Sequence, residues 1–205
     1  MKLSSTSITQ NAMIPETNAL GKQSAEGPVP SANKSPQLSW ADFPEATKSF
    51  VILACDPDVP ASAEDVNQSD RSVKYDFPRI DFYHWVLVDI PVSITSLEEG
   101  QDADGLKVGG KKPGTVAYGV RGLNDYTGWF SGDADMEGNY AGYDGPWPPF
   151  NDERIHHYNF TVFALNCESI GLDGLFDGRD VVTALEGKVI DQATLTGTYT
   201  LNLNL

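Results

Sequence analysis

The chain lacks a long apolar segment: no run of 18 apolar residues occurs among its 205 residues. A transmembrane helix needs about 20 such residues, so none is expected. Residues 1–6 lack the apolar core of a signal peptide, and we therefore expect a cytoplasmic protein. Cysteines are few as well. Cys55 and Cys167 lie far apart in apolar segments, and we predict two buried free thiols rather than a disulfide framework.

Basic side chains are also scarce, since 14 Lys and Arg residues oppose 29 Asp and Glu residues and the net charge is −15. Phosphate backbones and anionic membrane surfaces need compensating Lys and Arg, so neither nucleic acid nor such a membrane is expected as the main partner. A single small anion in a local pocket remains compatible with this charge. The length predicts one domain over residues 1–205.

Hydrophobic patterning predicts a mostly β protein. Strands are expected at Phe50–Cys55, Phe82–Ile90, Tyr158–Leu165 and Thr194–Leu205, and a short helix is expected at Asp180–Leu185. The first strand is predicted to stop at a turn, Asp56-Pro57-Asp58. Strict alternation in the second strand places His84, Val86 and Val88 on one face and Tyr83, Trp85 and Leu87 on the other. Because both faces carry bulky side chains, this strand is predicted to be central in its sheet.

Three stretches lack such periodicity. Residues 1–32 are predicted to be an extended N-terminal segment draped over the core, and residues 61–81 and 126–141 are predicted to be surface insertions. Residues 133–144 loosely match the spacing of a calcium-binding loop. Their flanks are rich in Gly and Pro rather than helical, so we favour an acidic, solvated loop and predict no metal site.

Polar side chains cluster beside the predicted strands. They lie in Asp56–Pro60, at His84, in the rigid turn Gly142–Pro149, and at His156 and Tyr158. A single histidine in a strand is most often a core residue. Three histidines near strand ends, with aspartates and a Gly/Pro-rich turn, indicate a pocket instead.

Six motifs follow one another in order from residue 33 to residue 199. They are Asn33-Lys34-Ser35-Pro36-Gln37-Leu38-Ser39-Trp40, Asp56-Pro57-Asp58-Val59-Pro60, His84-Trp85-Val86, the turn Gly142–Pro149, His156-His157-Tyr158-Asn159-Phe160 and Ala193–Tyr199. Together they resemble the phosphatidylethanolamine-binding protein family, in particular its bacterial Raf-kinase-inhibitor-like branch. One departure stands out, because His157 occupies the position where that family usually has Arg.

The resemblance implies a large central antiparallel sheet packed on a smaller sheet, with short peripheral helices. It also implies a pocket at one edge of the sheet that accepts phosphate-like anions or phosphoethanolamine headgroups. The pocket residues carried over by motif are Asp56, His84, Gly145, His156 and Tyr158, supported by Asp58, Pro60 and Pro146. No catalytic residue, cofactor or metal ligand is implied, and bacterial relatives suggest a homodimer.

Each residue of this set has an expected role. His84 and His156 can donate ring N–H groups to an oxyanion, Gly145 its backbone N–H and Tyr158 its hydroxyl. Asp56 would repel an anion, so we expect it to accept a hydrogen bond from a histidine or to meet the ammonium of a zwitterionic headgroup. The structural alternative is an Asx turn before Pro57.

Non-enzymatic binding of a small anion or phospholipid headgroup, with a possible regulatory role, is the favoured function. A hydrolase that uses His84, His156 and Asp56 as acid–base groups or metal ligands is the first alternative. Against it, the sequence contains no nucleophile elbow and no H-E-x-x-H motif. The second alternative is a protease or kinase inhibitor, or another interaction module, that contacts its partner through residues 61–81 or 126–141.

Overall fold

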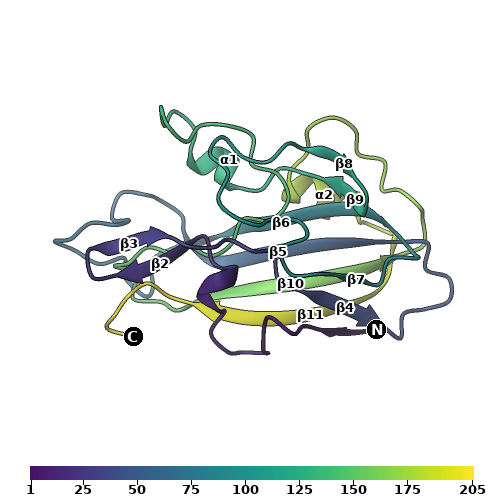
Figure 1. The fold of residues 1–205 in the computed structure, drawn as a ribbon, viewed down its shortest axis with the longest axis horizontal. Helices are drawn as coiled ribbons and strands as arrows, with labels where there is room; N and C mark the ends of the chain where they lie inside the picture. The colour runs from purple at the N-terminus through teal and green to yellow at the C-terminus, as the bar shows by residue number, and fades with distance from the viewer.

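The computed structural model describes residues 1–205 and contains three groups of strands and three short helices (Figure 1). The long strands are β5 (Ser49–Pro60), β6 (Arg79–Pro91), β10 (His156–Leu165) and β11 (Val189–Tyr199). The short strands are β1 (Lys2–Ser4), β2 (Gly21–Ser24), β3 (Gly27–Pro30), β4 (Leu38–Ala41), β7 (Ser96–Leu97), β8 (Gly114–Val116) and β9 (Gly119–Arg121). The helices are α1 (Tyr126–Trp129), α2 (Gly178–Ala184) and the 3-10 helix η1 (Glu16–Asn18).

Six strands form the large sheet in the order β11-β10-β5-β6-β9-β8, and three form a small sheet in the order β1-β4-β7. The strands β2 and β3 make a separate two-stranded sheet. All neighbouring strands pair antiparallel. The predicted fold class, a large antiparallel sheet with a smaller one and short peripheral helices, is therefore confirmed.

Both faces of the large sheet are buried. The larger core lies between the two sheets and includes Trp40 of β4, Trp85 of β6 and Phe160 of β10. The smaller core lies on the opposite face, where α2 covers the sheet through Val181. Strand β6 has β5 on one side and β9 on the other, so the prediction of a central strand here is correct.

Two strand ends differ from the predicted ones. Strand β5 does not stop at a turn but continues to Pro60, because Pro57 lies in a β-bulge between Asp56 and Val59. A bulge leaves a residue unpaired, so the missing N–H of proline costs no ladder hydrogen bond there. Strand β11 ends at Tyr199, which pairs with the first residue of β10. The alternating residues 200–205 thus have no neighbouring strand, and Leu203 is 78% exposed.

The aperiodic stretches contain more ordered packing than the sequence indicates. Residues 1–32 include β1, η1 and the β2–β3 hairpin rather than only extended chain. Within residues 126–141, the side chains of Tyr126 and Tyr140 are buried, so this stretch is not simply a surface insertion. The last residues of 61–81 belong to β6, which begins at Arg79. The loop that precedes β6 is mostly exposed.

Candidate ligand-binding site

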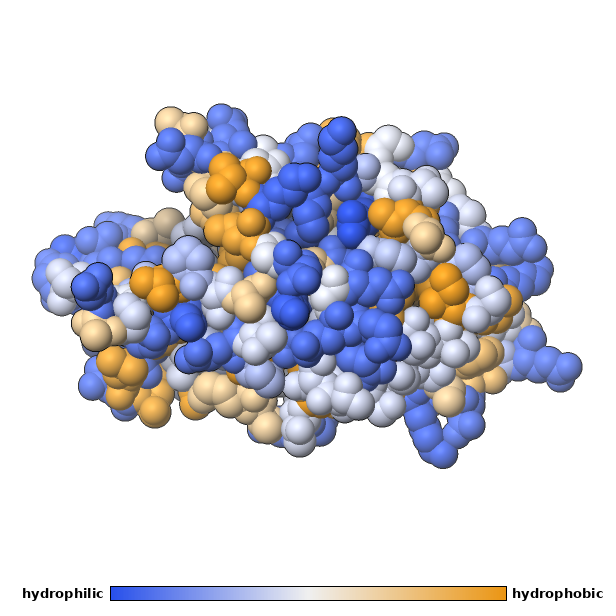
Figure 2. Space-filling model, viewed as in Figure 1, coloured by the Kyte–Doolittle hydropathy of each residue, from blue (hydrophilic) through white to orange (hydrophobic).

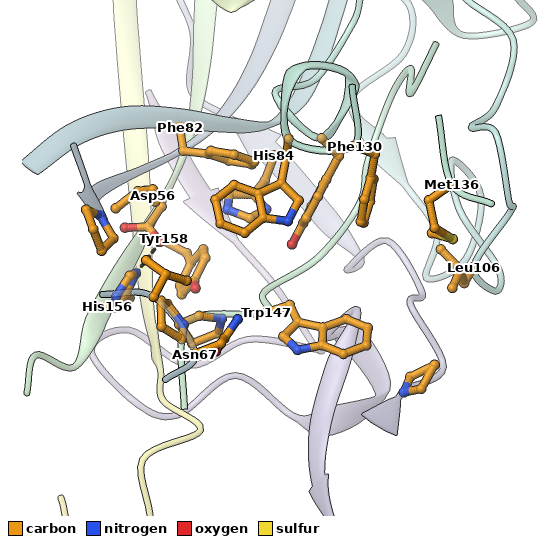
Figure 3. A pocket seen from close by; sticks show the side chains of 18 residues that line it. Asp56, Asn67, Phe82, His84, Leu106, Phe130, Met136, Trp147, His156 and Tyr158 are labelled. Atoms are coloured by element: carbon orange, nitrogen blue, oxygen red, sulfur yellow. Dashed lines mark hydrogen bonds and ion pairs between the residues drawn. The ribbon is translucent and has the colours of Figure 1, made fainter. Parts of the chain in front are cut away.

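A cavity of about 360 Å³ lies where β5, β6 and β10 come together at one end of the large sheet (Figure 3). Its polar floor consists of Asp56 from β5, His84 from β6, and His156 and Tyr158 from β10. Its walls are mostly apolar and are made by Pro30, Val59, Pro60, Val66, Asn67, Phe82, Leu106, Tyr126, Trp129, Phe130, Met136, Trp147, Pro148 and Pro149. The structure thus brings four of the five predicted pocket residues to one place.

A β-bulge turns His84 toward this cavity. Ala54 of β5 pairs with Trp85 of β6, but the next residue, Cys55, pairs with Tyr83, so His84 is the extra residue on β6. His84 and Trp85 therefore face the same side of the sheet, whereas Tyr83 joins the core on the opposite side. The alternation predicted for this strand is wrong at this point, because a bulge interrupts the two-residue period and re-aims a side chain.

His84 is a neutral, fixed ring. Its Nδ1 lies 2.9 Å from the carbonyl oxygen of Asp144, and a carbonyl only accepts, so Nδ1 carries the proton. Burial lowers the pKa of His84 below its ordinary value even though the nearby Asp56 carboxylate opposes that change. The ring bonds to the protein through Nδ1 alone, and His84 lines the cavity. The prediction that His84 donates an N–H to an oxyanion is therefore wrong, because the free nitrogen accepts.

Tyr158 supplies a hydrogen-bond donor beside that acceptor. Its ring packs edge-on against the ring of His84, with centroids 5.1 Å apart. Burial raises the pKa of the Tyr158 phenol well above its usual value, and the charge of Asp56 adds to the effect, so the hydroxyl stays protonated. A hydrogen bond to the Asp56 carboxylate also raises this pKa, so a ligand in the cavity competes with Asp56 for the hydroxyl proton.

His156 is held between two carboxylates. Its Nδ1 is 2.7 Å from Asp56 Oδ2 and its Nε2 is 3.1 Å from Asp152 Oδ2, so both nitrogens donate and the ring is an imidazolium. Burial acts to lower the pKa of His156, but the two carboxylates outweigh burial and raise it to about 9. Both N–H groups are occupied, so the prediction that His156 donates to an oxyanion is wrong. Its charge still acts on the cavity through space.

The carboxylate of Asp56 combines two of the roles that the sequence left open. Its Oδ2 accepts from His156, and its Oδ1 accepts from the backbone N–H of Asp58 at 2.8 Å, across Pro57. Asp152, the other partner of His156, is bound by Arg79 through two hydrogen bonds of 2.5 and 3.0 Å. Two cations, His156 and Arg79, thus face two carboxylates, and the four buried charges sum to zero.

Asp58 and the residue that replaces the family arginine lie outside the cavity. The Asp58 carboxylate accepts from Arg154 at 3.0 Å and from His157 at 2.8 Å. Although burial opposes it, these contacts lower the pKa of Asp58. The side chain of His157 is 52% exposed and does not line the cavity. Of the other supporting residues, Pro60 lines the cavity wall, whereas Pro146 does not.

The Gly/Pro-rich turn is fixed by one buried aspartate. The side chain of Asp144 accepts hydrogen bonds of 2.8 Å from Asn33, Lys111 and Asn124. Its backbone N–H donates to the carbonyl of His84, and its own carbonyl accepts from the His84 ring. The turn therefore holds the tautomer and position of His84. Asn33 lies in a motif that the sequence singles out, but no sequence signal indicated that Asn33, Lys111 and Asn124 converge on one carboxylate.

Gly145 is a packing position rather than a ligand contact. Its backbone N–H donates to Asn33 Oδ1 at 2.8 Å, so it is not free to bind an anion. A Cβ at this position would lie 2.3 Å from the carbonyl oxygen of Asn18, inside the protein and not in the cavity. The predicted role of Gly145 as a backbone donor to the ligand is therefore wrong. The glycine is needed because the turn packs tightly against residues 18–20.

Aromatic residues that the sequence did not single out form the cavity walls. Phe82 and Tyr126 pack around the ring of His84, with centroid distances of 4.8 and 5.5 Å. Phe130 stacks on Tyr126, and Trp147 lies across the cavity from it (Figure 3). Trp129 is 46% exposed, and hydrophobic residues gather on the surface beside α1 (Figure 2). The only signal for this wall was the density of aromatic residues between 126 and 147.

Comparison with known proteins agrees with this geometry. The family model described as phosphatidylethanolamine-binding protein matches residues 4–200. The chain belongs to the phosphatidylethanolamine-binding protein family. It is 33% identical over 167 residues to the UPF0098 protein YbcL of Escherichia coli, covering 82% of this chain and 72% of YbcL. It is 32% identical over 169 residues to a UPF0098 protein of Aquifex aeolicus, covering 80% of this chain and 73% of that protein.

Solved structures of this family share the fold. The crystal structure of E. coli YbcL, described as a new member of the mammalian PEBP family, superposes with a TM-score of 0.67 and 27% identity over 97% of each chain. A PEBP homologue from Chlamydia trachomatis, CT736, superposes with a TM-score of 0.63 at 24% identity, covering 96% of this chain and 95% of that one, and so shows the fold alone. No helix of the structure has the length and hydropathy that crossing a membrane requires.

Proposed function

We propose that this protein binds, without covalent chemistry, a small ligand with a phosphoryl-type head group, such as phosphate or phosphoethanolamine. The head group meets Nε2 of His84 and the hydroxyl of Tyr158, and any apolar remainder lies against the aromatic walls. One observation carries the proposal: the floor of an otherwise largely apolar cavity holds the ring of His84, bonded to the protein through Nδ1 alone, and the neighbouring phenol of Tyr158. A few convergent polar groups in an apolar pocket are the usual arrangement of a small-molecule site.

The charges of the floor favour a ligand of low net charge. No Lys or Arg lines the cavity, and the imidazolium of His156 is already compensated by the carboxylates of Asp56 and Asp152. A zwitterion, a monoanion or a small dianion that keeps one proton gains from the nearby imidazolium without facing an uncompensated carboxylate. A polyanion lacks the several cations that it would need. Phosphoethanolamine, with one ammonium group, fits this balance.

The alternative of a hydrolase has less support from the geometry. Both nitrogens of His156 already donate to carboxylates, so Nε2 of His84 is the one histidine nitrogen of the cavity that is free to act as a general base. No Ser, Thr, Cys or Lys lines the cavity as a nucleophile. These observations favour binding. The role of an inhibitor or interaction module stays a prediction, as does a homodimer.

Calorimetric titration with phosphate and with phosphoethanolamine tests the proposal. We expect saturable binding to the wild-type protein and a rise in Tm from binding to the native state. Tyr158→Phe removes only the hydroxyl, and one hydrogen bond to a charged group is worth about 1.5–3 kcal/mol, so affinity should fall about tenfold or more. Tyr199→Phe is the matched control, because that buried hydroxyl donates to Gly21 outside the cavity. Equal affinities for both variants and wild type would place the ligand elsewhere.

A further inference from the structure

We propose that a ligand of this cavity must donate a hydrogen bond to Nε2 of His84, so that the site selects head groups that carry a proton there. Two kinds of group meet this requirement: a phosphate oxygen that retains its hydrogen, and an ammonium group. The inference rests on the proposed function, since it assumes that a head group occupies the floor of the cavity. It adds a rule for which head groups bind.

The first step of the argument is the tautomer of His84. Its Nδ1 is bonded to the carbonyl oxygen of Asp144, and the N–H of Asp144 donates to the carbonyl of His84 at 2.9 Å. The side chain of Asp144 is in turn anchored by Lys111 and by two asparagines. The carbonyl that accepts from Nδ1 therefore cannot move away. The proton of the neutral ring is held on Nδ1, and Nε2 keeps its lone pair.

The second step is that the ring cannot turn over to exchange its two nitrogens. It is enclosed by three aromatic rings, those of Phe82, Tyr126 and Tyr158, at centroid distances of 4.8, 5.5 and 5.1 Å. The backbone of β6 is also bonded on both sides, to β5 and through Asp144 to the turn. A closely packed side chain keeps one orientation.

The third step is that His84 does not take up a second proton near neutral pH. The ring is 4% exposed, and its burial lowers its pKa. The charged groups that act on it are the carboxylates of Asp56 and Asp125, which favour a proton, and the imidazolium of His156, which opposes one. Burial outweighs the carboxylates. A ligand oxygen without a proton would therefore meet a lone pair and be repelled.

This requirement separates ligands of nearly equal size and charge. At about pH 8 inorganic phosphate is mainly a dianion that still carries one proton, because phosphate esters and related groups lose their second proton near pH 6 to 7. Sulfate is also a tetrahedral dianion but has no proton. A phosphodiester has no proton on its phosphate, so the head group of glycerophosphoethanolamine donates only through its ammonium, and its glycerol hydroxyls are shared with glycerophosphocholine. Glycerophosphocholine has a quaternary nitrogen and cannot donate from it.

Calorimetric titration of these four compounds at about pH 8 tests the rule. We expect phosphate to bind about tenfold or more tightly than sulfate, or glycerophosphoethanolamine to exceed glycerophosphocholine by a similar factor. If the pair of phosphate and sulfate shows binding, the ligand class is free phosphate. If the pair of glycerophosphodiesters shows binding, the ligand class is a lipid headgroup. His84→Gln offers both an amide N–H and a carbonyl to the cavity. The ratio of the two affinities within a pair should therefore fall toward one. His157→Gln, a change at an exposed histidine of β10 that does not line the cavity, should keep the preference.

The outcomes separate the two proposals. Equal affinity within either pair that binds the wild-type protein would overturn the donor rule and leave the proposed function standing. Binding of none of the four compounds would overturn the proposed function itself. These wild-type measurements suffice even if His84→Gln does not fold.

Discussion

Raising the pH through about 9 is expected to destabilise the protein by removing the proton of His156. The carboxylates of Asp56 and Asp152 overcome the opposing effect of burial and raise the pKa of His156 from 6.5 to about 9 in the folded state. A raised pKa stabilises the protein fully below about pH 6.5, and that stability is lost as the pH rises through 9. At 1.36 kcal/mol for each pH unit, the shift corresponds to about 3 kcal/mol.

Urea unfolding of wild type and His156→Gln between about pH 6 and pH 10 measures this contribution. The difference between the two proteins removes the common effect of tyrosine and cysteine ionisation at high pH. We expect the advantage of the wild type to shrink by about 3 kcal/mol across this range. His157→Gln, an exposed change of the same kind, should show no comparable trend. A difference that stays constant with pH would mean that His156 is neutral, and the bonds to both carboxylates would then be wrong.

Two further predictions concern packing and the buried charges. Gly145→Ala should destabilise the protein by about 2 kcal/mol or more, because the new Cβ would lie 2.3 Å from a backbone oxygen, whereas Gly128→Ala meets open space and should change the stability little. Thermal unfolding of both variants tests this expectation, and equal Tm values would contradict the close packing of Gly145 against Asn18. Arg79→Met removes one of the two cations beside the buried carboxylates of Asp56 and Asp152, leaves one negative charge uncompensated and should cost about 3–5 kcal/mol. Arg71→Met, at exposed ion pairs, should cost far less, and similar losses of the two variants in urea unfolding would refute the buried pair.

The local hydrophobic pattern of the sequence predicted much of the fold, but it did not predict the β-bulges that interrupt the strands. Alternation of bulky residues predicted a central strand at β6, and it was correct because both faces of that strand are covered. The same alternation placed His84 on the wrong face, because a one-residue bulge leaves no mark in hydrophobic periodicity. A second bulge misled the prediction for β5. Proline usually ends a strand, but Pro57 lies in this bulge, where its missing N–H is not needed for pairing.

Four of the five residues predicted for the candidate site line the cavity, but their roles could not be predicted from the sequence. Asp56, His84, His156 and Tyr158 line one cavity, yet which histidine is charged depends on carboxylates and carbonyls brought in from other segments. Asp152 precedes His156 by four residues and bonds to it, although no helix makes that spacing meaningful. Such partners are set by tertiary packing, so residue type and spacing could not show that one histidine donates twice while the other accepts.

The central claim is that a head group binds at Nε2 of His84. A long-range proton–nitrogen NMR spectrum of the imidazole rings tests it most directly, since the chain has only three histidines and single substitutions assign them. Without ligand we expect His84 to show one protonated and one unprotonated nitrogen, and His156 to show two protonated ones. Added phosphate should shift Nε2 of His84 strongly and leave His157 unchanged. A spectrum in which saturating phosphate leaves the His84 resonances in place would contradict the account.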